Sequence, residues 1–528
     1  MTGGFSYRLL RPYTRFTRME PYKNWSREEL IARLQQLDPH HDRPRPSQHD
    51  ALRKSKPFDF NAYPKRKIAL KFTYNGIHYG GMEFQRDPVL PTVEGVLFDA
   101  LVHTKLVDRE GGLDGCGWQR CGRTDKGVSA GGQVVSLWVR SGSGSSKAAV
   151  SEAPQASTPS QSSSSADPED ASEEGPGLEG DFGLMGDFDE PPTNASLPSN
   201  PPPQVGSAED DNTSYIYKLN HILPPTIRIL AWSPVADDFS ARHSCRWRHY
   251  KYFFSPQGLD LEAMSDAAAR LVGEHDFRNL CKIDPGKQLT VFTRRILHAS
   301  IDPVDPARPD GPHVFNLRGN AFLYNMVRHI MAVLLLVGTR LEQPSVMSAL
   351  LNVDPENPLP PFRPGEPAPP VVQSKPEYII ADPLPLMLWE CGYDEGALDW
   401  RVDPTKVTAG DYAKSPIRGM LSAHERALIG AALEEHFLKA AEAHHTRPRP
   451  YFPLGAPGVD VLPPGAMMSV PLGGGMVKRM ATYTPLLERK RMMTPEEVNE
   501  RYRLGRGAKR LEKRAAAASA VADDDGDE

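Results

Sequence analysis

A carboxylate stands between two cations in the glycine-rich segment Cys121–Ala130. Within this segment Arg123 precedes Asp125, and Lys126 follows it. Neighbouring positive charge favours the ionised form of a carboxyl group, and an ionised, positioned carboxylate can act as a covalent nucleophile. The same composition also suits an ordinary solvent-exposed turn, so the segment alone leaves both interpretations open. Asp125 is the candidate nucleophile.

Cationic and aromatic side chains alternate in a second segment, Asp238–Tyr252. Alternate residues of a strand point to the same face, so one set of these side chains shares a face. Aromatic rings stack on unpaired bases while arginine and lysine side chains meet phosphates, which suits RNA with an exposed base. A half-buried edge strand would show the same alternation, and both interpretations stand at this point.

A lone arginine near the start of an apolar helix marks a third segment, Arg318–Ile330. A buried cation is costly unless it is paired and hydrogen-bonded. Arg328 therefore needs a partner, and taken alone it predicts a structural ion pair. The apolar run that follows, Ile330–Val337, is too short to span a bilayer and predicts a buried helix.

In this order, the three segments resemble the TruA family of pseudouridine synthases. Residues Gly122–Ala130 carry every fixed position of the family signature Gly-Arg-Thr-Asp-x-Gly-Val-x-Ala. The second segment is similar to the family's Phe-x-Ala-Arg…Arg-x-Tyr-x-Tyr pattern, and the third is similar to its Ala-Phe-x-x-x-x-Val-Arg helix. The resemblance covers residues 67–393 apart from the stretch 141–214. Two departures, Asn75 for the family's aspartate and a missing aromatic residue in Gly81–Glu83, lie outside the expected catalytic residues.

The resemblance implies roles for four side chains. Asp125 is expected to be the nucleophile and Arg328 the cation that pairs with it. Tyr250 is expected to pack on the target base and to accept its proton, and Arg123 is expected to hold the place of the flipped nucleotide. The implied reaction isomerises uridine without redox chemistry or phosphate transfer, so neither a cofactor nor a metal is expected.

The resemblance also implies a fold of the α+β class. Two ferredoxin-like halves would form a joined antiparallel sheet, with helices on one face and a basic central cleft. The mixed order of strand-like and helix-like segments independently favours α+β with a largely antiparallel sheet. The predicted strands are 68–74, 133–139, 227–232, 249–254 and 314–319, and the predicted helices are 91–104, 261–271, 322–337 and 409–445.

Composition divides the chain into five parts. Residues 1–66 are predicted to form an N-terminal arm with a short amphipathic helix, and residues 67–140 and 215–400 to form the two halves of the catalytic domain. Residues 141–214 are rich in serine, proline, glycine and acid. They cannot bury enough apolar surface to offset the entropy of ordering, which predicts a disordered insertion. Residues 401–528 form a C-terminal extension with a basic segment and an acidic, disordered tail.

Flanking segments narrow the resemblance to the eukaryotic enzymes that act at positions 38 and 39 of the tRNA anticodon stem-loop. The segments that carry it are Trp25–Leu30, Phe58–Phe60, Asn279–Asp284, Tyr483–Arg491 and Pro495–Asn499. The expected partner is this stem-loop, and a homodimer that shares one tRNA is a further expectation. Two alternatives stay open: a pseudouridine synthase with a broader range of tRNA or RNA sites, and a non-catalytic tRNA-binding chaperone. A nucleotide-dependent enzyme is disfavoured, because the glycines at 111–117 lack Rossmann spacing and a P-loop lysine.

Charge and composition exclude several classes of protein. The formal net charge of −5 would disfavour a nucleic-acid partner, but much of the acid lies in 141–214 and 523–528, so the remainder is more basic. Five cysteines form no even framework and predict reduced thiols. No apolar run reaches the ~18–20 residues that span a bilayer. We expect the nucleus and cytoplasm, with Arg489–Arg491 as a nuclear signal, while the arginine-rich first 20 residues leave mitochondria as the alternative.

Overall fold

The computed structural model describes residues 58–86, 88–141, 214–402, 416–446 and 467–509. Contacts divide the chain into two units, residues 1–59 and 60–528, and every element named below belongs to the second unit. The helix predicted in the N-terminal arm, residues 142–213 of the insertion and the acidic tail lie outside the described residues.

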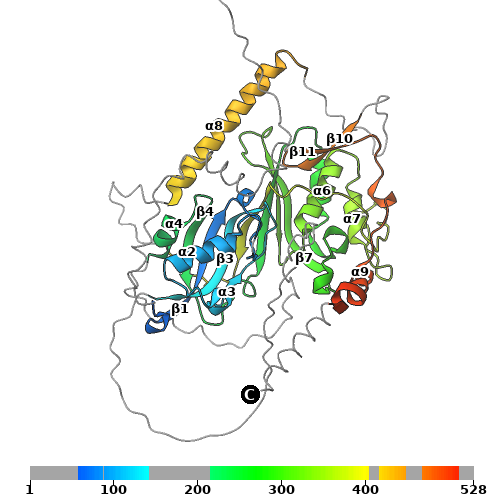
Figure 1. Ribbon diagram of the computed structural model, residues 1–528. Helices are drawn as coiled ribbons and strands as arrows, with labels where there is room; N and C mark the ends of the chain where they lie inside the picture. Colours follow the sequence, from blue (N-terminus) through cyan, green and yellow to red (C-terminus); the bar gives the residue numbers. More distant parts are fainter. Residues whose placement is uncertain (1–57, 87, 142–213, 403–415, 447–466, 510–528) are drawn as a thin grey trace, which may run out of the picture. The chain divides into compact units, whose positions relative to one another are not determined.

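One large sheet organises the described part of this unit (Figure 1). The strands of the structure are β1 (Lys65–Tyr74), β2 (Gln119–Arg120), β3 (Ser129–Arg140), β4 (Ile227–Pro234), β5 (Trp247–Phe254), β6 (Gly273–Asp276), β7 (Thr293–Pro303), β8 (His313–Gly319), β9 (Leu386–Gly392), β10 (Met468–Gly473) and β11 (Met476–Met480). The large sheet has nine strands in the order β4–β1–β3–β9–β5–β8–β7–β6, with β2 paired to β3 beside this path. Strands β10 and β11 pair only with each other among the described residues.

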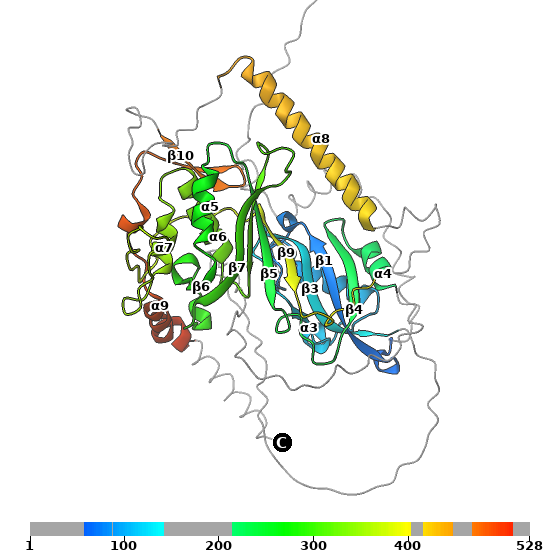
Figure 2. The same cartoon turned by 180° about the vertical axis from the view of Figure 1, so that it is seen from behind.

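Helices pack beside both parts of the sheet. They are α2 (Val93–His103), α3 (Gly112–Gly115), α4 (Tyr215–Ile222), α5 (Leu261–Ala269), α6 (Met326–Gly338), α7 (Ser345–Leu351), α8 (Pro416–Glu442) and α9 (Pro495–Tyr502). Figures 1 and 2 show α2 and α4 beside β1, β3 and β4, and α5 to α7 beside β7. Side-chain caps begin three of these helices: Thr92 accepts from the Gly95 amide, Asp260 from the Ala263 amide and Thr494 from the Glu497 amide.

The sheet is mixed rather than wholly antiparallel. Every other strand pair in it is antiparallel, but β3 and β9 run parallel where Ser129 and Ala130 face Met387 and Leu388. The expectation of a joined antiparallel sheet is therefore wrong at this one junction. Because β3 and β5 run in opposite directions, the single strand between them must be parallel to one of the two.

The β9 junction brings two of the chemistry-bearing segments together. Ala130 of β3 pairs with Leu388 of β9, and Leu388 pairs in turn with Tyr250 of β5. Neighbouring strands lie about 4.8 Å apart, so β5 lies about 10 Å from the start of β3. Figure 2 shows β9 between these two strands. Asp125 lies four positions before Ser129, the first residue of β3, which places the candidate nucleophile at this end of the sheet.

Most predicted elements are present, with several shifted boundaries and several strands not foreseen. The predicted helix 322–337 begins only at Met326, because Asn325 adopts a left-handed backbone conformation with φ of 57°. Asparagine tolerates this conformation better than most residues, and it ends the turn that leads into α6. Strands β2, β6, β7, β9, β10 and β11 were not predicted. Of the predicted stretch 409–445, α8 covers the central part, and residues 409–415 lie outside the described residues.

The core is centred on α6 and the large sheet. Twelve of the thirteen residues of α6 are buried, and Arg328 is the exception.

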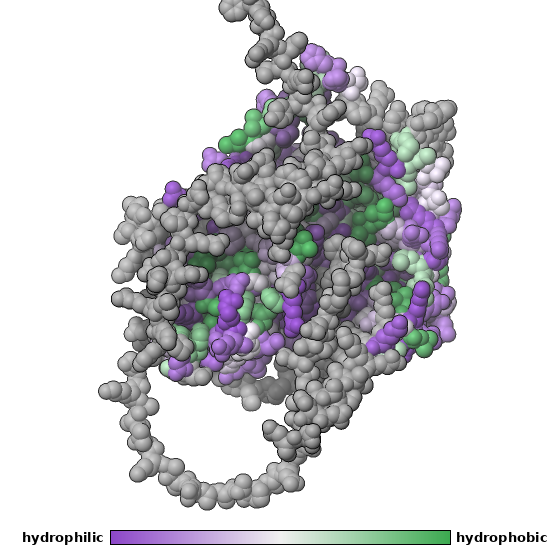
Figure 3. Space-filling model, in the orientation of Figure 1, coloured by the Kyte–Doolittle hydropathy of each residue, from purple (hydrophilic) through white to green (hydrophobic). Residues whose placement is uncertain are grey.

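No helix among the described residues is long and apolar enough to cross a membrane. The surface seen in Figure 3 mixes hydrophilic and hydrophobic residues over the described part of the chain. All five cysteines are buried, and none forms a disulfide.

Gly76 fixes the approach of the β1 turn to the loop that carries Asp125. The Gly76 amide donates to Ser129 Oγ at 3.0 Å, and a Cβ at this position would overlap the Val128 carbonyl. Main-chain atoms of the loop would have to move to admit any side chain there. Gly115 offers a matched control, because a Cβ there would meet no atom within 4 Å.

We therefore expect Gly76→Ala to lower the free energy of unfolding by about 1–3 kcal/mol, the usual cost of overpacking, and Gly115→Ala to leave it nearly unchanged. Thermal denaturation of both variants beside the wild type measures the difference. Equal melting temperatures for Gly76→Ala and the wild type would show that the loop yields without cost.

Candidate active site

The loop before β3 is held by hydrogen bonds from three directions. The Gln133 side chain donates to the Gly122 carbonyl at 2.7 Å, and the hydroxyls of Tyr74 and Thr124 lie 2.6 Å apart. The Met82 amide donates to the Thr124 carbonyl at 3.2 Å. These contacts come from β3, β1 and the segment before α2, so the backbone on the N-terminal side of Asp125 is fixed.

Asp125 and Arg328 lie close together, as the resemblance implied. Arg328 Nη1 is 3.6 Å from Asp125 Oδ2, and each side chain is 15% exposed. Arg328 also makes two hydrogen bonds: Nε donates to the Ala381 carbonyl at 2.7 Å, and Nη1, the atom nearest Asp125, donates to Asn325 Oδ1 at 3.4 Å. The pair is therefore a single close approach and not a two-point, bidentate ion pair.

Burial raises the pKa of Asp125 from its ordinary 3.8 to about 6, and the nearby Arg328 and Lys282 oppose that rise. The expectation that Arg123 and Lys126 keep this carboxyl ionised is not met, because neither contributes to the shift. Removal from water costs the charged form more than the two cations return. The carboxylate still predominates at neutral pH.

Arg123 points to a different carboxylate. Its Nη2 lies 2.9 Å from Glu83 Oε1, and the two side chains are 20% and 30% exposed. Arg120 also approaches Glu83, at 3.3 Å, and lies 3.0 Å from the fully buried Glu94. Arg123 thus belongs to a network of two arginines and two glutamates beside Asp125.

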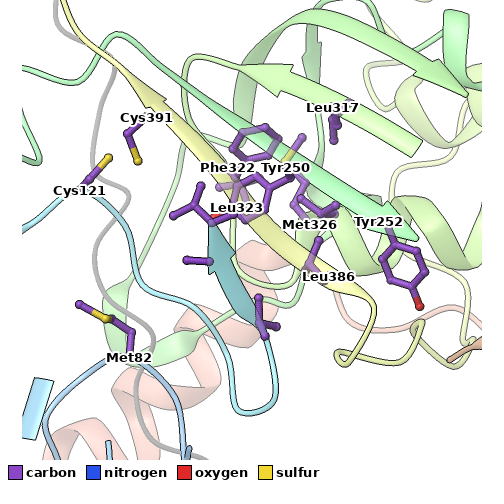
Figure 4. Close-up of a cluster of buried hydrophobic side chains, with 14 of the residues drawn as sticks. Met82, Cys121, Tyr250, Tyr252, Leu317, Phe322, Leu323, Met326, Leu386 and Cys391 are labelled. Carbon is purple, nitrogen blue, oxygen red and sulfur yellow. The ribbon is translucent and has the colours of Figure 1, made fainter. Parts of the chain in front are cut away.

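Tyr250 borders the same small cavity as Asp125. The cavity holds about 30 Å³, and Thr124, Phe322 and Arg328 also line it. The Tyr250 ring is buried and meets the edge of Phe322, with ring centroids 4.9 Å apart (Figure 4). Burial raises the pKa of the Tyr250 hydroxyl well above its ordinary value. The phenol is therefore neutral.

A much larger cleft of about 860 Å³ also borders Asp125. Its walls carry Arg123, Lys126, Lys282 and Arg328 together with apolar residues. Lys282 Nζ lies 5.1 Å from the centre of the Tyr324 ring, in cation–π geometry. A cationic and aromatic wall of this kind suits a nucleic-acid strand.

Sequence reasoning missed three of these residues. Lys282 and Tyr324 lie within quoted segments, but Lys282 served only to mark the branch of the family and Tyr324 received no role. Glu83 received no role either, and its acidic character beside a proposed RNA site was the available signal. The local sequence pattern does not reveal which side chains these three residues contact in the fold.

Arg248 joins all three motif segments from inside the protein. Its guanidinium donates to the carbonyls of Cys121 at 3.2 Å, Arg242 at 3.1 Å, Cys245 at 3.4 Å and Asn320 at 2.8 Å. The side chain is buried, with 7% exposure. As a cation of the second segment it was expected to meet phosphates, and this expectation is wrong: Arg248 crosslinks main chain. Cys121 and Cys391 lie beside this region (Figure 4).

Among the described residues, no group of three or more histidine, cysteine, aspartate or glutamate side chains is arranged to hold a metal ion. The groups that line the site are Asp125, Tyr250 and the cations around them. A partly desolvated carboxylate, a neutral phenol and a guanidinium at one end of a cationic cleft suit nucleophilic attack and proton transfer on a bound base.

The sequence of the chain is similar to those of known proteins. A family model described as tRNA pseudouridine synthase matches residues 267–394. A Saccharomyces cerevisiae protein named tRNA pseudouridine(38/39) synthase is 32% identical over 507 residues, which covers 91% of each chain. A human protein of the same name is 35% identical over 344 residues, 64% of this chain and 57% of the human one. A tRNA pseudouridine synthase A from Methanothrix thermoacetophila is 29% identical over 70% of this chain and 96% of its own length.

The agreement with the yeast protein extends over nearly the whole of both chains, and the matched region includes Asp125, Tyr250 and Arg328, which the fold brings to one site. The chain therefore belongs to the family of tRNA pseudouridine synthases.

Proposed function

We propose that this protein converts uridine to pseudouridine in the anticodon stem-loop of tRNA, at positions 38 and 39. The observation that carries the proposal is the Asp125 carboxylate, held 3.6 Å from Arg328 between the cavity beside Tyr250 and the cationic cleft. The names of the yeast and human relatives support the choice of positions. The reaction breaks the bond from C1′ to N1 and rejoins C1′ to C5, so the atoms of the uridine balance without a co-reactant.

The target base must leave its stack before Asp125 can reach it. Extrusion of a base costs roughly a few kcal/mol, which contacts between the RNA backbone and the cleft would offset. The cavity of about 30 Å³ between Asp125 and Tyr250 has room for about one water molecule and not for a pyrimidine ring. The base therefore enters with a rearrangement of the side chains that line the cavity. Ionised Asp125 then cleaves the glycosidic bond, by attack at C1′ or through a glycal intermediate.

Tyr250, Arg328 and Arg123 have supporting roles in this proposal. Tyr250 packs on the uracil and takes the C5 proton; as a neutral phenol it must pass its own proton on as it does so. Arg328 stabilises the carboxylate of Asp125. Arg123 exchanges Glu83 for the RNA and fills the space that the base leaves.

The strand order of the large sheet supports this proposal. We infer that β4, β1 and β3 with their helices form one ferredoxin-like half, that β5, β8, β7 and β6 form the other, and that β9 joins them. The cleft at the junction is basic on the wall formed by Lys126, Lys282 and Arg328. This placement suits an RNA stem-loop that crosses both halves.

Asp125→Asn is expected to abolish pseudouridine formation, because an amide is neither a nucleophile nor a base at this position. Affinity for tRNA should stay within about tenfold, or roughly 1.4 kcal/mol, since the substitution changes no side-chain volume. Single-turnover assays that detect pseudouridine by chemical derivatisation, with filter binding of the same tRNA, measure both quantities. Pseudouridine formed at the wild-type rate would remove Asp125 from the mechanism. An unchanged pseudouridine content in the tRNA of cells that lack this protein would favour a non-catalytic role.

The pH profile should report the ionisation of Asp125. Its pKa is raised to about 6, and the protonated form is inactive, so kcat/KM should rise with pH through a midpoint near 6 and level off above it. Arg328→Met removes a cation that lowers this pKa, so the midpoint should move to higher pH. Arg328→Lys keeps a positive charge and should move it less. A midpoint that stays the same in Arg328→Met would show that another group titrates.

Tyr250→Phe should retain tRNA affinity and lose turnover, because the ring still packs on the base while the proton acceptor is gone. General-base catalysis usually contributes about 10²–10⁴-fold, so a loss of at least about 100-fold in the single-turnover rate is expected. A rate equal to that of the wild type would leave Tyr250 with stacking alone.

A further inference from the structure

Three consecutive glycines form the turn of the C-terminal hairpin β10–β11. Gly473, Gly474 and Gly475 have φ values of 84°, 58° and 77°. Residues with a side chain rarely adopt this left-handed backbone conformation, which glycine adopts without steric cost. The turn therefore has a backbone path that other residues would strain, and the path brings the hairpin against the catalytic domain.

The hairpin turn lies on Tyr252 and Asp382. The Asp382 amide donates to the Leu472 carbonyl at 2.7 Å, and the Tyr252 hydroxyl donates to the Asp382 carbonyl at 2.9 Å. A Cβ at Gly473 would overlap that hydroxyl. Glycine is thus required at position 473 for close packing as well as for its φ, whereas a Cβ at Gly475 would meet nothing within 4 Å.

Ala381, the residue before Asp382, makes two hydrogen bonds with Arg328. Arg328 Nε donates to the Ala381 carbonyl at 2.7 Å, and the Ala381 amide donates to the Arg328 carbonyl at 3.2 Å. Because Nε is held there, the plane of the guanidinium is set by the position of Ala381. That plane places Nη1 at 3.6 Å from Asp125.

The hairpin and the segment that follows it make further contacts with the core. Met468 and Val470 of β10 are buried in the main core. Farther along the extension, Tyr483 Oη and the Leu486 amide both donate to Glu342 Oε1, at 2.5 and 2.6 Å. Glu342 follows α6, the helix that carries Arg328. The extension thus contacts both the helix of Arg328 and the segment that orients its guanidinium.

We propose that the β10–β11 hairpin is a positioning element for catalysis, in which Gly473 packs on Tyr252 and Asp382 so that Ala381 keeps Arg328 directed at Asp125. This inference rests on the proposed function of Asp125 and Arg328. It assigns a role to the C-terminal extension, whose described residues contribute no side chain to the cavity or the cleft beside Asp125.

The test compares Gly473→Ala with Gly475→Ala, which carry the same left-handed backbone but differ in the contact with Tyr252. Displacement of a reacting group by about 1 Å can cost about 100-fold in rate. Gly473→Ala should lower kcat by about 10–100-fold with little change in KM, and should move the pH midpoint of kcat/KM upward. Gly475→Ala should leave both near wild type. Equal kcat values and equal midpoints for the two variants would overturn the proposal.

A second variant and a second readout cover a Gly473→Ala protein that fails to fold. Tyr252→Phe keeps the ring and removes only the hydrogen bond to Asp382, so it should change kcat and the pH midpoint in the same direction; wild-type values would overturn the proposal. The charged and titratable groups that face Asp125 are Arg328, Lys282 and Tyr324, and neither variant alters them.

The titration of Asp125 can also be followed directly, by carboxyl ¹³C resonances of aspartate-labelled protein, with Asp125→Asn for assignment. A higher midpoint in Gly473→Ala or Tyr252→Phe than in Gly475→Ala supports the proposal, and identical midpoints overturn it. This measurement needs no activity. A wild-type protein that forms no pseudouridine would defeat the proposed function, while the titration would still decide whether the hairpin positions Arg328.

Discussion

The carboxylate of Asp125 is largely buried, and the surrounding structure depends on how its negative charge is offset. One guanidinium approaches it, at 3.6 Å. Two unit charges at this distance attract by about 4 kcal/mol at an effective dielectric constant near 20. The pKa of Asp125 nevertheless rises to about 6, so desolvation outweighs the attraction. The carboxylate is ionised at neutral pH and yet poorly solvated, which is a useful state for a nucleophile.

Two rigid elements hold the members of this pair. Asp125 stands on a loop tied to β1 and β3, and Arg328 stands in the first turn of the buried helix α6. Arg248 links the loop to the other two motif segments through four main-chain carbonyls. A buried cation surrounded by acceptors of this kind is costly to remove, because the carbonyls would lose their donors. The geometry of the site is thus set by the main chain as much as by side chains.

Arg123 forms an ion pair within the protein. It lies against Glu83 instead of Asp125, so the carboxylate of Asp125 keeps Arg328 as its close partner. An RNA phosphate or base that takes up Arg123 has to replace Glu83. Charged pairs that are a fifth to a third exposed contribute modestly to stability, and such an exchange is accessible at low cost.

Local pattern predicted several secondary-structure elements, and the family resemblance predicted the chemistry of the three motif segments. The alternation in residues 68–74 and 249–254 and the apolar run after Arg328 predicted strands and a helix that the fold contains, because these periodicities arise from neighbours along the chain. The motif residues Asp125, Tyr250 and Arg328 were identified by their resemblance to the motifs of the family. Residues 293–303 and 386–392 lacked a pattern strong enough to predict β7 and β9.

Tertiary structure alone decided how these parts combine. The parallel insertion of β9 between β3 and β5, the pairing of Arg123 with Glu83, the burial of Arg248 and the contact of Gly473 with Tyr252 all join residues far apart in sequence. Strand order and the partner of a buried charge depend on such contacts, which no local periodicity encodes. The sequence by itself therefore determined which carboxylate could react, and the fold determined its pKa, because burial and the placement of Arg328 are properties of the packed chain.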